Sequence, residues 1–431
     1  MDIQQIATLC KTAALSMSAL STQVKNNALE NIITALKHNT SQIFDANARD
    51  LEQAQKDNLD APLLKRLKFD HSKLVEACDG IESLIRLEDP VGKTLSALEL
   101  DNGLELYKVS RPIGVIGVIF ESRPDALVQI AALCLKSGNA VLLKGGSEAS
   151  ATNQILAAVI CAAAIEAGCP EGWLGLLETR SDVTQMLQLD HAVDLIIPRG
   201  SNEFVKYIMD NTNIPVLGHA DGICHLYIDK LADPSMAVAL AVDSKCQYVA
   251  VCNAIETILV HQIIADTVLP MLQHALESQG VKIFGCSRTR SVIDVDPATQ
   301  TDWQTEYLDL IVSIKVVDSL DDGLAHINQY GSGHTDVIVT SDRQRALYFM
   351  DRADTADAFW NCSSRFADGF RFGLGAEVGI STNKIHARGP VGLEGLMIYQ
   401  WRMLGNGHQV KDYVGANARP FTHKPILRTF F

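Results

Sequence analysis

The first part of the chain has the apolar spacing of helices. Apolar side chains recur every three to four positions in Ile3-Ile6-Ala7-Cys10 and in Leu29-Ile32-Ile33-Leu36, and similar spacing continues to about residue 90. This spacing predicts an all-helical opening layer. Residues 95–109 instead mix apolar and polar side chains in alternation, with Asn102-Gly103 in their middle. Because Asn-Gly favours a type I′ turn, we expect a β-hairpin there.

Short apolar runs alternate with amphipathic stretches after residue 112. The runs predict buried strands at 113–120, 140–144, 174–177 and 195–198, with helices at 125–136, 148–167 and 202–211. A second series of predicted strands follows at 254–260, 281–284, 310–317 and 335–340. Strands that alternate with helices in this way predict two mostly parallel, doubly wound sheets, whose ligands bind at the carboxyl ends of the strands.

Composition and charge exclude several classes of protein. With 431 residues, 47% of them apolar and 20% charged, the chain predicts two or three globular domains. Lys and Arg number 37 against 51 Asp and Glu, a net charge of −14, so nucleic acid and anionic membranes are not expected partners. The apolar runs, such as 157–164, are too short to span a membrane. Ten cysteines without a C-x-x-C pair, and a first segment unlike a signal peptide, favour a reducing cytoplasm.

Basic residues follow three predicted strands. Arg123 lies in Ser-Arg-Pro-Asp after the strand at 113–120, where it either starts a helix or faces an anionic ligand. Lys144 precedes two glycines at the next junction, although the motif matches neither G-x-G-x-x-G nor the phosphate-binding loop that ends in Gly-Lys-Ser/Thr. Arg199-Gly200-Ser201 leads into a helix whose free N–H groups can receive a phosphate. Together the three junctions favour a nucleotide site.

One cysteine has the setting of a nucleophile. Cys252 precedes Asn253 at the start of a predicted strand, and a polar segment comes before it in the sequence. Most cysteines, in contrast, are simply small buried apolar residues. Cys246 is its nearest rival. A zinc site made of His219, Cys224 and His225 is the alternative, but the paired spacing of zinc ligands is missing, so we expect no metal.

Several long motifs resemble those of one family. They include 143–149 (LKGGSEA), 196–201 (IIPRGS), 218–225 (GHADGICH), 252–257 (CNAIET), 331–336 (GSGHTD) and 373–382 (GLGAEVGIST). In them and along nearly its whole length, the chain resembles the gamma-glutamyl phosphate reductase family, also called glutamate-5-semialdehyde dehydrogenases, of the aldehyde dehydrogenase superfamily. The sequence resembles the stand-alone form rather than the form fused to a glutamate kinase.

The resemblance implies a fold and a division into domains. It implies an α/β, aldehyde-dehydrogenase-like architecture with two doubly wound α/β domains and a small β oligomerisation element. The NADP-binding domain would comprise 1–94 and 112–233, and the catalytic domain 234–390. The hairpin at 95–111 and the tail at 391–431 would form the oligomerisation element of a homo-oligomer, a dimer or a tetramer.

The resemblance also implies a reaction. The Cys252 thiolate would attack L-glutamyl 5-phosphate, expel phosphate and form a thioester, and NADPH would reduce it to L-glutamate 5-semialdehyde. This is the second step of proline biosynthesis from glutamate, so functional coupling to a separate glutamate kinase is expected. The backbone N–H of Cys252 and the side chain of Asn253 would stabilise the oxyanion.

The remaining roles follow from the same resemblance. NADP(H) would be bound by Lys144, Gly200, Ser201 and Glu306. The anionic groups of the substrate would be bound by Arg123, Arg199 and Arg365, with further hydrogen bonds from His225 and His334.

Two departures from typical aldehyde dehydrogenases are informative. The chain has Gly218-His-Ala-Asp-Gly-Ile in place of the Glu-Leu-Gly-Gly-Lys stretch that carries the general base, and Phe120-Glu-Ser-Arg-Pro in place of Pro-Trp-Asn. Loss of the base suits a thioester that is exchanged with phosphate instead of hydrolysed. The alternatives are a cysteine acyltransferase or hydrolase without a dinucleotide, a zinc-dependent dehydrogenase and a non-catalytic scaffold.

Overall fold

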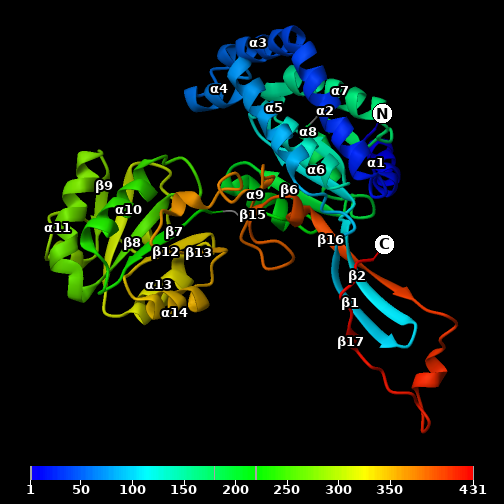
Figure 1. Ribbon diagram of the computed structural model, residues 1–431. Helices are drawn as coiled ribbons and strands as arrows, with labels where there is room; N and C mark the ends of the chain where they lie inside the picture. The colour runs from blue at the N-terminus through cyan, green and yellow to red at the C-terminus, as the bar shows by residue number, and fades with distance from the viewer. Residues whose placement is uncertain (1, 179, 219–220, 431) are drawn as a thin grey trace.

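The computed structural model describes residues 2–178, 180–218 and 221–430 of the chain. Its fold is organised by the strands. They form a four-stranded sheet, a seven-stranded sheet, a second four-stranded sheet and a two-stranded ribbon. Figure 1 shows the first two sheets in separate α/β bodies, and the third in an arm that projects from the first body. The two α/β bodies confirm the predicted fold class.

The first body is a parallel sheet covered by helices on both faces. Its strands have the order β5-β4-β3-β6 and all neighbours pair in parallel. Strands β3 and β4 are buried along their whole length, as expected for uninterrupted apolar runs between two helical layers. Its elements are α1 (Ile3–Met17), α2 (Thr22–His38), α3 (Thr40–Lys56), α4 (Ala61–Leu67), α5 (His71–Arg86), β3 (Val115–Phe120), α6 (Pro124–Lys136), β4 (Ala140–Lys144), α7 (Ser150–Glu166), β5 (Leu174–Leu177), α8 (Arg180–Met186), β6 (Leu195–Arg199) and α9 (Asn202–Asp210).

The helical layers of the first body enclose two apolar cores. Residues of α2, α5, α6 and α7 fill one face of the sheet, and residues of α1 and α8 contribute to the other. The segment Ser147–Glu166 is long and apolar enough to cross a membrane by length and composition alone. Half of that window is buried inside the protein, and α7 packs against α2 and α3, which is the setting of a core helix.

The second body is a parallel sheet of seven strands in the order β10-β9-β11-β8-β7-β12-β13. Helices α10 and α11 pack on one face, and α13 and α14 on the other. Its elements are β7 (Cys224–Ile228), α10 (Pro234–Cys246), β8 (Ile255–His261), α11 (Gln262–Ser278), β9 (Lys282–Gly285), α12 (Ser287–Arg290), β10 (Asp296–Pro297), β11 (Ile311–Val317), α13 (Leu320–Tyr330), β12 (Thr335–Val339), α14 (Arg343–Arg352) and β13 (Asp357–Trp360).

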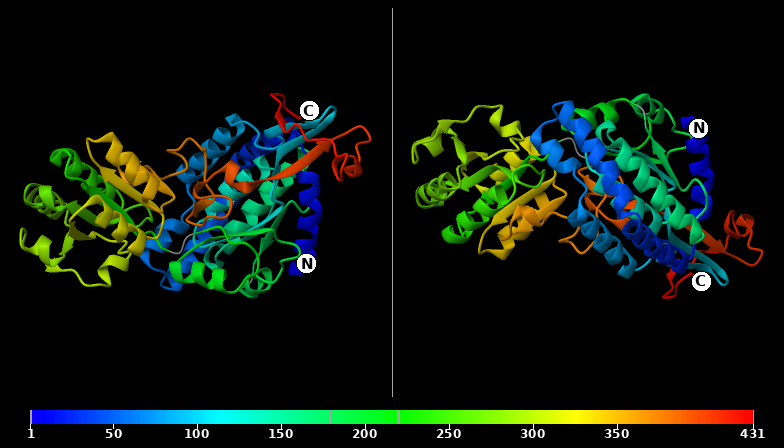
Figure 2. Two further views of the ribbon diagram at one scale, coloured as in Figure 1. Left: turned by 90° about the horizontal axis from the view of Figure 1, so that it is seen from below. Right: turned by 90° about the horizontal axis from the view of Figure 1, so that it is seen from above.

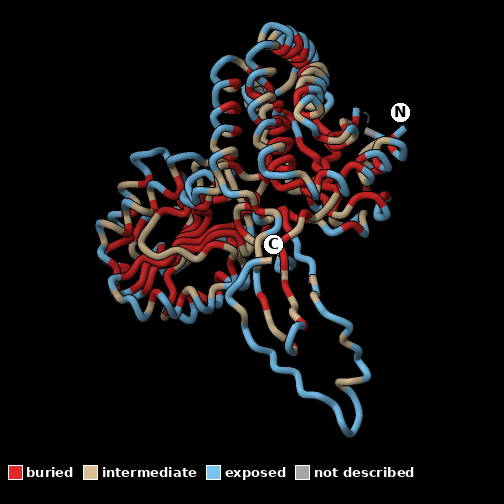
Figure 3. Tube along the Cα trace, turned by 45° about the vertical axis from the view of Figure 1, so that its right-hand side comes forward, coloured by how far each residue is buried: buried red, intermediate tan, exposed pale blue. Residues whose placement is uncertain are grey.

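The arm is an antiparallel sheet that joins the predicted hairpin to the tail. Its order is β16-β2-β1-β17, from β1 (Thr94–Asp101), β2 (Leu104–Pro112), β16 (Met397–Leu404) and β17 (Lys424–Pro425). The turn departs from the expected type I′, because only Gly103 has a positive φ, at +76°. Much of the arm is exposed in Figure 3, whereas the sheets of both bodies are buried.

Two domain boundaries differ from those expected from the sequence. β7 pairs with β8 and β12, so the second sheet already includes residue 224 and does not begin near 234. Residues 376–396 belong to the core of the first body through side chains such as Val378 and Leu393, with β14 (Gly379–Ser381) and β15 (Gly389–Val391) between these two residues. Of this segment, residues 376–390 were expected in the catalytic domain and 391–396 in the oligomerisation tail. The sequence could not show this return of the chain to the first body, because it depends on long-range packing.

The views in Figure 2 show the two bodies side by side, with the arm at the far end of the first body. The carboxyl ends of β3 and β6 and the loop before β8 line one cavity. The carboxyl edge of the first sheet therefore faces the amino edge of the second, and residues from both bodies can meet there.

Candidate active site

Cys252 lies in the loop just before β8, at the amino edge of the second sheet. A cavity of about 740 Å³ adjoins it. The first body contributes the junctions after β3 and β6, and the second contributes the loop 250–252, Glu306 and Leu308. The predicted nucleophile therefore faces the predicted ligand-binding edge of the first sheet.

Gly222 allows a close approach to the backbone of Cys252. A Cβ at position 222 would lie 2.4 Å from the Cα and the carbonyl oxygen of Cys252, and 2.6 Å from its Cβ. Real Cβ atoms essentially never approach within 3.0 Å, so no other residue fits without moving the nucleophile. From β7, the Cys224 Sγ donates a hydrogen bond to the carbonyl oxygen of Cys252 at 3.1 Å.

The Cys252 thiol is half-buried and neutral at ordinary pH. Burial raises its pKa from 9.0 to about 12, and the carboxylates of Glu306 and Glu377 raise it further. Its own backbone amide and the guanidinium of Arg199 act in the opposite direction. A thiolate therefore has to form in response to a ligand, because in the free protein its charge is disfavoured.

A strained turn at the end of β3 carries Arg123. Ser122 has φ +43°, which is uncommon for a residue other than glycine. Its backbone N–H and its Oγ donate to the Glu148 Oε1, at 2.7 and 2.6 Å. β3 and β6 pair in parallel with Phe120 opposite Arg199, so both arginines lie at the same edge of the sheet.

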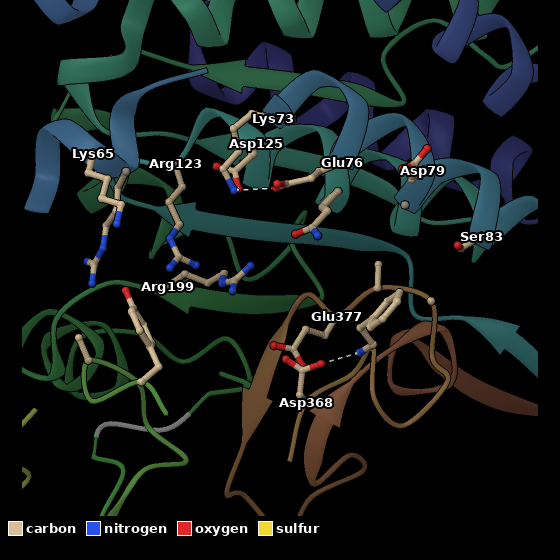
Figure 4. Close-up of a pocket in the computed structure, with 18 residues that line it drawn as sticks. Lys65, Lys73, Glu76, Asp79, Ser83, Arg123, Asp125, Arg199, Asp368 and Glu377 are labelled. Atoms are coloured by element: carbon tan, nitrogen blue, oxygen red, sulfur yellow. Dashed lines mark hydrogen bonds and ion pairs between the residues drawn. The ribbon is translucent and has the colours of Figure 1, made fainter. Parts of the chain in front are cut away.

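Arg123 and Arg199 line both the cysteine cavity and an adjoining cavity of about 730 Å³. Figure 4 shows their guanidinium groups close together between the helical layer and the loop of Asp368 and Glu377. Among the described residues, neither guanidinium has a hydrogen bond or an ion pair within 4.0 Å. Burial and the neighbouring Arg123 lower the pKa of Arg199. Two like charges that form no ion pair within 4.0 Å among the described residues suit an anionic group.

Glu377 is the carboxylate that both cavities share. Its Oε2 accepts a hydrogen bond from the backbone N–H of Gly369 at 2.8 Å. Burial raises the pKa of Glu377, and Arg199 partly offsets this effect. When burial disfavours the charged form of a carboxylate, that carboxylate accepts a proton more readily than an exposed carboxylate does.

The junction between β6 and α9 suits a phosphate group. Ser201 caps α9 by accepting the N–H of Phe204 at 3.4 Å, and Gly200 precedes it on the cavity. A Cβ on Gly200 would lie 2.9 Å from the Phe204 ring and 3.0 Å from the Glu121 Oε2. A larger residue at 200 would therefore press on these two side chains, beside the first N–H groups of the helix, which are donors for an anion.

Lys144 and Glu306 were both expected at the cofactor. Glu306 lies on the cavity, and its Oε2 accepts a hydrogen bond from the Asn202 Nδ2 at 2.7 Å. Lys144 is buried at the end of β4, where its Nζ donates to the Gly145 carbonyl, and it does not line this cavity. Gly145 is required by packing, because a Cβ there would lie 2.1 Å from the Asn153 Nδ2.

Four of the residues predicted for the site have other environments. The Asn253 amide is buried and donates to the Ala367 carbonyl at 2.8 Å, so it does not face the cavity. The Arg365 Nε donates to the Gln247 Oε1 at 3.0 Å, and Arg365 lines neither cavity, although its charge is close enough to affect Cys252.

His225 and His334 are the other two, and both are fully buried in the second body. The His225 Nδ1 lies 3.0 Å from the Asp336 Oδ1, and the His334 Nδ1 lies 2.7 Å from the Thr335 Oγ1. Their sequence motifs therefore belong to the packing of β7 and β12. Neither histidine lines the two cavities, so direct contact with a substrate is not supported.

The alternative zinc site has no support in the part of the chain that the structure describes. No group of three or more His, Cys, Asp or Glu residues could hold a metal ion among those residues. Cys224 is buried with its Sγ on the Cys252 carbonyl, and His225 faces Asp336. His219 lies outside the described residues.

Sequence reasoning missed Glu377, Gly222 and Asn202 as site residues. Both Gly222 and Glu377 lie within motifs that carry the family resemblance, at 218–225 and 373–382. Those motifs were signals, but they could not show that the two segments flank one cysteine. Asn202 follows Gly200-Ser201 directly, and its amide reaches both Glu306 and Asp221.

The chain is similar to known proteins along nearly its whole length. The aldehyde dehydrogenase family matches residues 1–283. The gamma-glutamyl phosphate reductase of Pelotomaculum thermopropionicum is 60% identical over 430 residues, which cover 100% of this chain and 99% of that protein. That of Acetivibrio thermocellus is 59% identical over 430 residues and covers 100% of both chains.

A solved structure supports the same comparison in three dimensions. The crystal structure of the gamma-glutamyl phosphate reductase of Thermotoga maritima is similar to this chain with a TM-score of 0.93 and 38% sequence identity. The match covers 95% of this chain and 100% of the other. The two α/β bodies and the arm are therefore shared with a solved relative.

Proposed function

This chain belongs to the gamma-glutamyl phosphate reductases of the aldehyde dehydrogenase family, and we propose that it reduces L-glutamyl 5-phosphate to L-glutamate 5-semialdehyde with NADPH. It is an oxidoreductase of proline biosynthesis, as the resemblance implied. The observation that supports the proposed reaction is the convergence of the Cys252 thiol, two arginines without ion-pair partners among the described residues and a phosphate-binding helix start on one cavity.

Cys252 is the proposed nucleophile, and Glu377 the proposed proton acceptor. The thiol gives its proton to the Glu377 carboxylate, and the thiolate attacks the acyl carbon of the substrate. The bond from that carbon to the phosphate oxygen breaks, and the leaving phosphate takes the proton from Glu377. A thiol and an acyl phosphate thus give a thioester and hydrogen phosphate. The raised pKa of Glu377 and its effect on Cys252 support this role.

Arg199 and Arg123 are the proposed cations for the phosphate and the carboxylate of the substrate. Both lie on the two joined cavities, so a substrate with charge at both ends can contact them while its acyl carbon is beside Cys252. The backbone N–H of Cys252 faces the sulfur and is the remaining candidate for the oxyanion, because the Asn253 amide is bonded elsewhere.

The cofactor fits the junction after β6. Gly200 and Ser201 offer N–H donors to a diphosphate, and Glu306 is available to a ribose hydroxyl. When bound, NADPH would supply the hydride for reduction of the thioester, and Cys252 would be released from the aldehyde carbon as a thiolate. A nicotinamide cofactor follows from the family, and the preference for NADP over NAD is part of the proposal.

The arm is the proposed oligomerisation element. β16 is an edge strand, and its side chains Tyr399, Trp401 and Met403 are exposed at 44%, 53% and 57%. An exposed apolar edge strand readily pairs with another chain. A dimer or a tetramer therefore remains our prediction, as does functional coupling to a separate glutamate kinase.

One assay tests the proposed reaction. We expect wild-type protein to reduce NADP to NADPH with glutamate semialdehyde only when phosphate or arsenate is present, and more slowly with NAD. Cys252→Ala should abolish this turnover while NADPH still binds. Cys246→Ala is the matched control and should keep the activity. Turnover in Cys252→Ala, or turnover without phosphate or arsenate, would contradict the proposal.

A further inference from the structure

A buried ion pair lies beneath the active-site cavity and has no role in the reaction described above. The Lys245 Nζ on α10 is 2.6 Å from the Glu256 Oε2 on β8, and both side chains are fully buried. The Glu256 Oε1 is buried and has no hydrogen-bond partner among the described residues. Burying an ion pair of this kind costs desolvation free energy and rarely adds net stability to the fold, so a functional role for the pair should be tested.

The pair lies beside the turn that carries Glu306. The backbone amide of Leu308 lies close enough to the Glu256 carboxylate to favour its charged form. Leu308 itself has φ +52°, an unfavourable value for a leucine. The Lys245 Nζ lies 6.0 Å from the centre of the Tyr307 ring. The turn 306–308 therefore lies beside both members of the pair.

Other contacts fix the flanks of the turn. The Tyr307 hydroxyl donates to the Asp302 Oδ1 at 2.8 Å and lies 2.8 Å from the Ser313 Oγ. The Glu306 carboxylate accepts the Asn202 amide from the first body. Glu256 lies on β8, which begins just after Cys252, so the pair links the turn to the segment that also carries the proposed nucleophile.

We propose that the buried Lys245–Glu256 pair positions the turn 306–308, and so holds the Glu306 carboxylate at the bound cofactor relative to Cys252. The two residues are positioning residues and do not contact the substrate. The inference rests on the proposed role of Glu306 in binding the nicotinamide cofactor. It goes beyond that role by assigning a function to two groups that neither cavity exposes.

A matched pair of double variants separates positioning from stability. Lys245→Met/Glu256→Gln removes both charges at the site. Lys25→Met/Asp89→Asn is the control, because it removes another ion pair, 2.6 Å apart, in which Lys25 is buried and Asp89 is half-buried, and which lines neither cavity. Thermal unfolding of both proteins measures the common loss of stability, and NADPH fluorescence measures the dissociation constant of the cofactor without any need for turnover.

We expect the dissociation constant of NADPH to rise by roughly tenfold in Lys245→Met/Glu256→Gln, because this pair lies beside the turn of Glu306. In the control it should stay within about twofold, because the Lys25–Asp89 pair lines neither cavity. Glu306→Gln should raise it similarly. The triple variant should bind NADPH no more weakly than Glu306→Gln, because the pair acts through that residue. If the pair had only a structural role, the loss of NADPH affinity that its removal causes would be independent of the loss caused by Glu306→Gln, and the two losses would multiply.

The proposal is overturned if a folded Lys245→Met/Glu256→Gln protein binds NADPH as tightly as the wild type. It is also overturned if the control weakens binding equally, or if the loss multiplies with that of Glu306→Gln. If Lys245→Met/Glu256→Gln does not fold, Glu256→Gln alone is measured by the same criteria. Failure of the proposed reaction would be seen separately, as wild-type protein without phosphate-dependent turnover.

Discussion

The high pKa of the Cys252 thiol leads to a quantitative prediction about its reactivity. Burial, with Glu306 and Glu377, raises this pKa from 9.0 to about 12. At pH 8 a thiol of pKa 12 is thiolate in about one molecule in ten thousand, against about one in ten for a pKa of 9. Because only the thiolate is alkylated, Cys252 in the free protein should react with iodoacetamide about a thousandfold more slowly than a cysteine of ordinary pKa.

The assay follows labelling of the peptide that contains Cys252 by mass spectrometry, between pH 7 and pH 10. We expect its rate to rise about tenfold per pH unit without a plateau. Glu377→Gln should speed labelling, since it removes a negative charge, and should slow phosphate-dependent turnover, since it removes the proton acceptor. Arg199→Ala should slow labelling. A plateau below pH 9 in the wild type would refute the reasoning, as would parallel losses of labelling and turnover in Glu377→Gln.

Three further predictions concern the surroundings of the cysteine. Gly222→Ala should lower kcat by roughly a hundredfold, because its Cβ would displace Cys252, and retention of full activity would contradict the contact. Arg199→Ala should raise the KM for phosphate at least about tenfold in the assay with glutamate semialdehyde, whereas Arg365→Ala should change it less. Burial raises the pKa of Glu256 to about 7, so its contribution to stability is full below its ordinary value of 4.5 and is lost as the pH rises through about 7. Urea unfolding at pH 5 and pH 8 should therefore show a smaller loss of stability in Glu256→Gln than in the wild type.

The elements of the fold were largely predictable because their patterns are local. Helical spacing predicted the opening layer, and uninterrupted apolar runs predicted β3 and β4. The predictions that failed concerned contacts between segments that are far apart in the sequence. β7 joined the second sheet and residues 376–396 joined the first core, since the partner of a strand depends on packing that no local pattern encodes.

The same distinction explains the candidate site. Arg199 and Gly200 lie at the carboxyl end of a strand, where the topology of parallel sheets predicts ligands, and both line the cavity. Cys252 also lines it, but from the amino edge of the second sheet, and its residue type rather than the topology pointed to it. His225 and His334 lie in or beside strands that are buried on both faces, so the sequence could not tell a packed histidine from one that faces a ligand. Glu377 comes from a segment far along the chain and reaches the cysteine only through the fold.

The division of the cavity between two sheets would separate the proposed chemistry from the proposed recognition of the substrate. The sulfur belongs to the second body, whereas Arg123 and Arg199 belong to the first. Substitutions in α4, α5 or the turn after β3 can therefore change which head group is accepted, without disturbing the loop that carries the nucleophile. An engineer who wants a reductase for a different acyl phosphate has a reason to begin in the first body and to leave the segment from Gly222 to Glu256 unchanged.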